Sequence, residues 1–289
     1  MQLIKYILNF FWKLHKPFVK KNKAFKNKHL GETCFIFGNG GSLKYYDIDE
    51  LPDNPSIVCS YSLIDNRLKK MNVKYFALTD SYLLYPFLFN TYPHIRKFQI
   101  NNIKQIFWDS IRGYNKGITI FTSLTNIYAS FFKRLNINFF HHFEMKESNS
   151  CDLSGDFSTC HGALDVMLGM AQYMGFSKAI VMGCDYLGTP IMQGHFYADG
   201  RHKPHYSSKH HEEGYSNYRQ RVKAVGKDIE TLVILPEGVT SPDFNYDSYE
   251  NYFGLEKNYR DNFDFIDQKY IELLREAAES NQTIMREDV

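Results

Sequence analysis

The chain has 289 residues, a formal net charge of +2 and five cysteines. This length fits one large domain, or one domain with a small lid. The cysteines form no C-x-x-C pair, which argues against a zinc site and favours reduced thiols in a cytosolic protein. Residues 1–30 hold eight lysines and no acidic residue, so the remainder carries 26 basic against 32 acidic residues, a net charge of −6. We therefore expect no nucleic-acid partner for the main domain.

Residues 1–28 predict a basic amphipathic helix followed by a lysine-rich segment. The apolar residues recur near helical spacing with lysines between them: Leu3, Ile7, Phe10, Phe11 and Leu14. This apolar part is too short to span a bilayer, and no small-residue cleavage site follows it. A basic helix with Trp12 at its edge suits the surface of an anionic membrane. The alternative is a helix packed on the domain, followed by solvated lysines.

A glycine-rich turn follows the first predicted strand, Thr33–Phe37, and reads Gly38-Asn39-Gly40-Gly41-Ser42. Glycines at a strand end let backbone N–H groups approach an anion, and a following helix N-terminus favours negative charge. The turn lacks the Gly-Lys-Ser/Thr of a P-loop and the third glycine of G-x-G-x-x-G. It predicts either a phosphate site of a nucleotide-binding α/β domain or a glycine turn without a ligand.

Two further short strands end in small polar residues. The strand Ser56–Ser60 ends at Ser60, and Val73–Leu78 is followed by Thr79 and Asp80. Because ligands bind at the carboxyl ends of parallel strands, these ends and the glycine turn should form one rim. Other patterns before residue 150 predict a short helix or loop at 45–51, helices at 65–71 and 82–92, and strands at 103–108 and 118–122.

A helix followed by a strand predicts a β–α–β unit in the second half of the chain. The helix is Ala163–Gly175, and the strand Lys178–Gly183 is an uninterrupted apolar run after its first residue. The helix begins after His161-Gly162, where unpaired N–H groups and the helix dipole could hold a phosphate or the ligand's base. The strand ends at Cys184-Asp185-Tyr186. We interpret Asp185 either as orienting a hydroxyl or a neighbouring side chain, or as capping the following loop.

The polar segment 187–214 contains five of the eleven histidines within 17 residues: His195, His202, His205, His210 and His211. A loop this long and polar predicts a lid over an active site. A metal site is disfavoured because no H-x-x-x-H helix or cysteine pair accompanies the histidines. The preferred interpretation is a histidine general base with tyrosine and arginine partners for a phosphate.

The patterns after this segment complete the expected organisation. They predict a helix at Glu212–Val225, a last core strand at Thr231–Leu235, and peripheral helices near the end. We therefore divide the chain into a membrane-associating arm (1–30), a nucleotide-binding α/β domain with the lid 187–214 (31–245) and peripheral C-terminal helices (246–289). A reduced protein with such an arm is expected in the cytoplasm, peripheral on the inner face of the cell membrane.

The order of these motifs resembles the bacterial sialyltransferases of glycosyltransferase family 42, between residues 32 and 245. The residues that carry the resemblance are Gly38-Asn39-Gly40-Gly41-Ser42-Leu43, the Gly162-led helix, Gly183-Cys184-Asp185-Tyr186, Tyr197-Ala198 and a His-Tyr pair before a helix. The resemblance implies a Rossmann-like, GT-A-like variant with a mainly parallel sheet, helices on both faces and a short lid. It also implies inverting, metal-independent transfer of sialic acid or a related acid sugar from a CMP-sugar, without a cofactor, to a cell-surface glycan such as lipooligosaccharide or capsule.

By position, the resemblance places the donor nucleotide along polar residues at the strand ends and the helix start: Gly38, Asn39, Gly40, Ser42, Ser60, Thr79, Asp80, His161 and Gly162. Tyr197 would contact the departing phosphate, and Tyr186 would replace the family's second phosphate tyrosine, next to Asp185. His205 would be the general base, with His211 as the alternative. Imidazole accepts a proton near neutral pH, and tyrosine hydroxyls can stabilise charge on the leaving phosphate.

The sequence departs from the family pattern at donor-contacting positions. Leu187 stands where the family has its second phosphate tyrosine, and Ser60 stands where it has an asparagine. The donor could therefore be another CMP-activated acid sugar or a different nucleotide sugar. A diphosphokinase or other transferase with another nucleotide donor is the alternative enzyme, and a non-catalytic nucleotide-sugar-binding module is the alternative outside enzymes. The acceptor and the formation of homo-oligomers stay open.

Overall fold

The computed structural model describes most of the chain: residues 2–79, 97–114, 117–130, 137–141, 150–157, 162–201, 204–205 and 209–279. The helix expected at 82–92 lies outside these residues.

Eight parallel strands form the central sheet in the order β10-β9-β6-β1-β2-β3-β4-β5. Their bounds are β1 Thr33–Phe37, β2 Ser56–Cys59, β3 Val73–Leu78, β4 Thr119–Ser123, β5 Ile137–Phe140, β6 Lys178–Met182, β9 Glu230–Leu235 and β10 Asn245–Ser248. The central strands are apolar and buried on both faces, as a parallel sheet between two helix layers requires. The predicted α/β fold with a mainly parallel sheet is thus confirmed.

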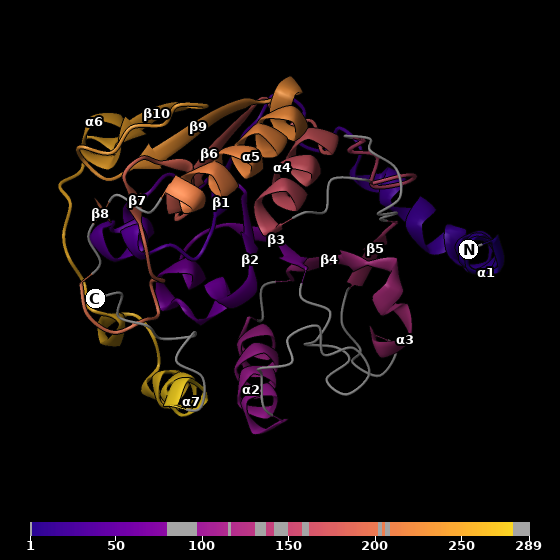
Figure 1. Cartoon of the computed structure of the whole chain (residues 1–289), viewed down its shortest axis with the longest axis horizontal. Helices are drawn as coiled ribbons and strands as arrows, with labels where there is room; N and C mark the ends of the chain where they lie inside the picture. Colours follow the sequence, from indigo (N-terminus) through magenta and orange to yellow (C-terminus); the bar gives the residue numbers. More distant parts are fainter. Residues whose placement is uncertain are drawn as a thin grey trace.

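Helices cover both faces of the sheet (Figure 1). α4 (Ala163–Tyr173) and α5 (Lys209–Val225) lie on one face, and α2 (Lys97–Gly113) and α7 (Gln268–Glu279) lie on the other. Strand residues alternate between two cores, so that Phe35 and Phe37 face one layer while Cys34 and Ile36 face the other. The remaining α-helices are α1 Gln2–Lys20, α3 Ile127–Ser130 and α6 Tyr249–Phe253.

Short elements connect these layers. The 3₁₀ turns are η1 Lys21–Phe25, η2 Gly41–Tyr45, η3 Ile48–Glu50, η4 Ser60–Ile64, η5 Asn66–Lys69, η7 Leu124–Asn126, η8 Asp185–Leu187, η9 Gly226–Asp228 and η10 Asn262–Asp264. Two further strands, β7 Ile191–Met192 and β8 Pro204–His205, pair antiparallel beside the main sheet.

The strand order reverses direction at β1. From β1 the chain proceeds through β2 to β5 on one side, whereas β6, β9 and β10 lie on the other. In open α/β sheets, ligands bind at the carboxyl ends of the strands beside such a switch point. The residues that follow β1 and β6 are Gly38 and Gly183, so the fold places the candidate site at these two turns.

The strand predicted at 103–108 is wrong, because these residues lie inside α2. Ile103, Ile106, Phe107 and Ile111 recur every three or four residues, and all four are buried on one helix face. A short apolar run is ambiguous between a buried strand and a buried helix when read alone. The segment 65–71 contains a 3₁₀ turn, whose start is capped by the Asp65 side chain accepting from the Arg67 N–H.

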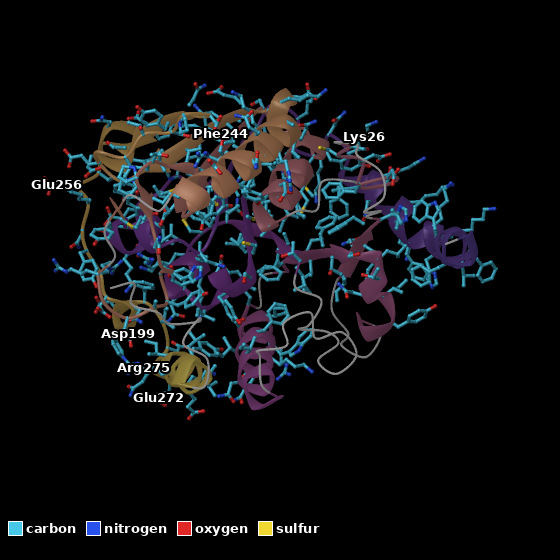
Figure 2. The ribbon with its side chains drawn as sticks, in the orientation of Figure 1. Lys26, Asp199, Phe244, Glu256, Glu272 and Arg275 are labelled. Carbon is cyan, nitrogen blue, oxygen red and sulfur yellow. The ribbon has the colours of Figure 1, made fainter. Side chains whose placement is uncertain are left out.

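The C-terminal region belongs to the same core as the sheet. β10 pairs with β9, and Tyr249, Tyr270 and Leu274 are buried in the layer that contains α2. Arg275 of α7 forms an ion pair with Asp199 in the segment after β7 (Figure 2).

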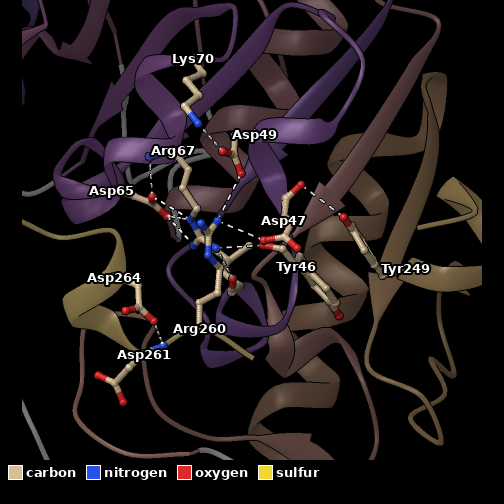
Figure 3. Close-up of polar contacts among 11 residues, drawn as sticks. Tyr46, Asp47, Asp49, Asp65, Arg67, Lys70, Tyr249, Arg260, Asp261 and Asp264 are labelled. Carbon is tan, nitrogen blue, oxygen red and sulfur yellow. Dashed lines mark hydrogen bonds and ion pairs between the residues drawn. The ribbon is translucent and has the colours of Figure 1, made fainter. Parts of the chain in front are cut away.

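Two arginines tie the turn after β1 to its surroundings (Figure 3). Arg67 is 3% exposed, pairs with Asp65 at 2.7 Å, and donates to the carbonyl oxygens of Leu43 and Tyr46. Its guanidinium also lies 3.8 Å from the ring centroid of Phe265. The second arginine is Arg260, from the C-terminal segment. It forms ion pairs with Asp47 at 3.0 Å and with Asp49 at 3.4 Å, both shortly after the turn.

The N-terminal helix packs against the β5 end of the sheet. Trp12 is half-buried and stacks on His141 with ring centroids 3.8 Å apart, so one face of this ring packs against the domain. On the opposite side of the same helix, Phe10 is 61% exposed and Leu14 is 59% exposed. Among the described residues, no helix is both long enough and apolar enough to cross a bilayer.

Candidate functional site at the β1 and β6 turns

The glycines of the first turn allow two turns to pack backbone against backbone. Gly38 donates its N–H to the Met182 carbonyl at 2.8 Å, and Gly40 donates to the Gly183 carbonyl at 2.7 Å. A Cβ on Gly38 would overlap the Gly183 carbonyl, and a Cβ on Gly40 would overlap the Asp185 carboxylate. Close approach between the two turns is therefore a sufficient reason for both glycines.

Asp185, the first residue of η8, binds Ser42 near the start of η2 through its carboxylate. Its carboxylate accepts from the Ser42 N–H at 2.9 Å and from the Ser42 hydroxyl at 2.5 Å, and its side chain is buried. Burial raises the pKa of Asp185 to about 6, although the hydrogen bonds from Ser42 work in the opposite direction. Asp185 thus orients a neighbouring side chain, that of Ser42, whereas these two hydrogen bonds go to the turn after β1 and not to the loop that follows Asp185.

The Asn39 amide remains available beside this pair. Its Oδ1 accepts from the Ser62 hydroxyl at 3.0 Å, while its backbone carbonyl accepts from the Phe196 N–H at 3.0 Å. Within the described part of the chain, no acceptor receives a hydrogen bond from the Asn39 Nδ2 group. The side chain is half-buried and oriented by Ser62, so its N–H₂ group can donate to a ligand.

The next two strand ends continue the rim. Ser60 directly follows β2 and has a φ of +49°, a left-handed conformation that non-glycine residues adopt rarely. Such backbone conformations are concentrated at functional sites, which favours a role for Ser60. Thr79 follows β3 and is half-buried. Since neighbouring strands lie about 4.8 Å apart, the ends of β1, β2 and β3 together span about 10 Å.

A tyrosine pair lies beside the N-terminus of α4. Tyr186 follows β6, and its ring centroid lies 5.4 Å from that of Tyr218 on α5. The Tyr218 hydroxyl donates to Asp165 at 3.2 Å and approaches Gly162 so closely that a Cβ there would overlap it. Burial raises the pKa of both tyrosines well above the ordinary value, so both hydroxyls keep their protons at neutral pH and act as donors.

Two rings from the polar segment complete the rim. Tyr197 is buried, and His195 stacks on it with centroids 4.9 Å apart and planes at 19°. His195 pairs with Gly40 through the backbone, and the residue as a whole is partly open to solvent although one face of its ring is covered by Tyr197. Burial of the ring against neighbouring residues lowers the pKa of His195 below its ordinary value, and the Asn39 backbone partly offsets this, which favours the neutral ring. Its position among polar groups at the rim makes it a candidate for ligand contact.

The fold thus groups most of the predicted residues that the structure describes. Gly38, Asn39, Gly40, Ser42 and Asp185 lie together at the switch point. Ser60 and Thr79 extend the rim along β2 and β3, while Gly162 and Tyr186 meet near Tyr218 and Tyr197 lies under His195.

Three predicted residues are not placed in this way. Asp80 and His161 lie outside the described residues, and His205 is described only by its backbone, which pairs with Ile191 in the β7–β8 ribbon. Their roles stay predictions. In the part of the chain that is described, no three His, Cys, Asp or Glu side chains cluster as metal ligands would.

Sequence reasoning missed Ser62, His195 and Tyr218 as members of the site. His195 lies two residues before Tyr197, so the His-Phe-Tyr triplet was a usable signal. Tyr218 could not be assigned from its neighbours in the sequence, because its partner Asp165 lies 53 residues earlier on another helix.

No family model matches the sequence, and no curated protein matches it. Among solved structures, the chain is similar to the monofunctional alpha-2,3-sialyltransferase Cst-I from Campylobacter jejuni, with 15% identity and a TM-score of 0.39, covering 88% of this chain and 96% of that one. It is also similar to the sialyltransferase CstII from Campylobacter jejuni in complex with a substrate analogue, cytidine-5'-monophosphate, with 14% identity and a TM-score of 0.40, covering 87% and 99%. A third similar structure is CST-II with trisaccharide acceptor and CMP, with 13% identity and a TM-score of 0.42, covering 80% and 92%. At these values we assign no function from the likeness.

Proposed function

We propose that this chain is an inverting, metal-independent glycosyltransferase that moves sialic acid or a related acid sugar from a CMP-sugar to a cell-surface glycan. The observation that carries the proposal is the grouping at the switch point. An available Asn39 amide precedes Gly40, whose backbone pairs with His195, and Ser42 of the same turn is held by Asp185. A nucleotide phosphate needs hydrogen-bond donors, and a sugar hydroxyl needs a proton acceptor.

The residues divide the chemistry between them. Asn39 donates to the donor's phosphate or ribose, while Tyr186 and Tyr197 donate to the phosphate as negative charge develops on it. Asp185 keeps Ser42 and its turn in place rather than contacting the sugar. A histidine imidazole from the lid segment 187–214 removes the proton of the attacking acceptor hydroxyl. The family resemblance assigns this step to His205.

Nucleotide preference is the first test of the proposal. Thermal unfolding is measured with CMP, CDP, UDP, GDP and ATP, each with and without magnesium, since a ligand that binds the folded state raises the unfolding temperature. Stabilisation by CMP without magnesium supports the proposal. A requirement for ATP and magnesium would point to a diphosphokinase, and CMP binding without any turnover would point to a binding module.

The base is identified by comparing three single variants. We expect His205→Ala to lower turnover by roughly two orders of magnitude or more, with little change in CMP affinity. His211→Ala and His195→Gln are measured beside it. If either of these shows that loss while His205→Ala does not, the base assignment is wrong and the reaction class still stands.

We also propose that the N-terminal arm rests on an anionic membrane, with the protein on the inner face of the cell membrane. Phe10 and Leu14 are exposed one helical turn apart, and the lysines beside them, Lys13 and Lys16, are exposed too. An exposed apolar stripe flanked by lysines fits the boundary between headgroups and acyl chains.

The membrane proposal is tested by sedimentation with anionic and neutral liposomes. Glutamate replaces four lysines that follow or end the helix: Lys20, Lys21, Lys23 and Lys26. We expect this variant to lose binding to anionic vesicles, because each lysine near the surface contributes about 1 kcal/mol. Phe10→Ser with Leu14→Ser should weaken binding as well. Unchanged binding by both variants would refute the proposal.

A further inference from the structure

A fully buried lysine holds the segment that follows Tyr197. Lys44, in the turn after β1, donates from Nζ to the Ala198 carbonyl at 2.5 Å and to the Gly200 carbonyl at 2.6 Å. A buried ammonium is costly unless its protons are hydrogen-bonded, so these contacts strongly favour one position of the segment. Burial lowers the pKa of Lys44, and the neighbouring carboxylates of Asp261 and Asp199 partly offset this effect.

The C-terminal segment holds the same stretch of backbone. Asn262 is fully buried, and its Nδ2 donates to the Tyr197 carbonyl at 3.0 Å and to Asp199 Oδ1 at 3.0 Å. The Tyr259 hydroxyl donates to the Gly200 carbonyl at 3.1 Å. Main-chain oxygens accept most of these bonds, so the contacts fix the path of the chain rather than a single side chain.

The turn that carries Lys44 and the C-terminal segment that carries Asn262 are also hydrogen-bonded to each other. The backbone N–H of Arg260 donates to the backbone carbonyl of Lys44 at 2.8 Å. On α7, Arg275 Nε donates to Asp199 Oδ2 at 2.9 Å, and these two side chains lie near each other in Figure 2. Residues 259–275 and the turn after β1 thus form one clamp around 197–200.

We propose that Lys44 and Asn262 are positioning residues that set the location of Tyr197. Residues 259–275 then contribute to the site through their contacts with residues 197–200. The inference rests on the proposed contact of Tyr197 with the donor phosphate. Hydrogen bonds to developing charge require placement within about 0.5 Å, and a misplacement of about 1 Å can cost about a hundredfold in rate. The clamp restrains the backbone of Tyr197 itself and of the residues directly after it.

The test is a double-mutant cycle between the clamp and the tyrosine hydroxyl. Asn262→Leu keeps the approximate volume and removes both hydrogen bonds, and Lys44→Met does the same for the lysine. We expect Asn262→Leu to lower turnover about tenfold in the wild-type background and to have no further effect in a Tyr197→Phe background. Equal losses in both backgrounds would show a merely structural role and overturn the inference.

Hydrogen exchange gives a readout that does not depend on the reaction. Amides of 197–201 should exchange faster in Asn262→Leu and in Lys44→Met than in the wild type. Lys257→Ala is the matched control, because Lys257 lies in the same C-terminal region and pairs only with Glu237 and Glu250 among the described residues. Unchanged exchange in both clamp variants would also overturn the inference. If Tyr197→Phe alone leaves turnover and CMP affinity unchanged, the role of Tyr197 fails instead, and exchange still decides whether the clamp exists.

Discussion

The turn 38–42 and the segment 195–201 meet at the same end of the sheet, but they are held in different ways. The turn is fixed by backbone contacts to the neighbouring β6 turn and by one carboxylate, Asp185. The segment is fixed by side chains from distant parts of the chain, chiefly Lys44 and Asn262. Substitutions of the glycines in the turn should therefore disturb folding first, whereas substitutions around the segment should disturb the placement of its rings.

The largest effect is expected at the turn. In Gly40→Ala the added Cβ overlaps the Asp185 carboxylate, so the two turns must separate. We expect a loss of about 3 kcal/mol in the free energy of unfolding, the upper end of the usual range for an overpacked core site, measured by denaturant titration. Gly113→Ala is the control, because no atom lies within 4 Å of a Cβ there. Equal stability of the two variants would contradict the packing explanation.

The next effect is a pH dependence of stability that arises from Asp185. Its folded-state pKa of about 6 lies above that of an unfolded aspartate, so the folded protein binds this proton more tightly. The contribution to the free energy of unfolding is present below about pH 4 and is lost as the pH rises to about 6, by up to about 3 kcal/mol. Asp185→Asn removes this dependence. If the free energy of unfolding changes with pH in the same way in the wild type and in Asp185→Asn, the pKa of Asp185 is not raised.

The smallest effect is expected at Asn39, and on binding rather than on folding. Asn39→Ala leaves the glycines and Asp185 untouched but removes an amide that can donate to a phosphate. We expect CMP affinity to fall about tenfold, the usual value for one hydrogen bond to a charged group, with little change in unfolding temperature. Calorimetric titration measures this. Unchanged affinity would place the ligand away from the turn.

The sequence predicted the sheet well where apolar runs are short and bounded by turn residues. β1 and β3 begin and end at the expected residues, because strand length and flanking turns leave few alternatives. The run at 103–108 was misassigned because its apolar residues also fit a helix face. The rim followed from the strand ends, since parallel strands place their carboxyl ends together.

The long-range contacts of the site were beyond sequence reasoning. Ser42 and Asp185 are 143 residues apart, and Lys44 reaches a carbonyl 154 residues away. Neither pair leaves a local pattern, and Lys44 resembles any other lysine in a list of residues. The predicted glycines also turned out to have a packing reason of their own, which the turn motif alone does not distinguish from phosphate binding.

The place where the N-terminal helix packs has a consequence for acceptors. That helix sits at the β5 end of the sheet, whereas the reaction would occur beside β1, four strand spacings or about 20 Å farther along. Under the proposed membrane attachment, a glycan tethered to that membrane would have to bridge this offset. Such an arrangement would act as a ruler that favours long tethered chains over short ones.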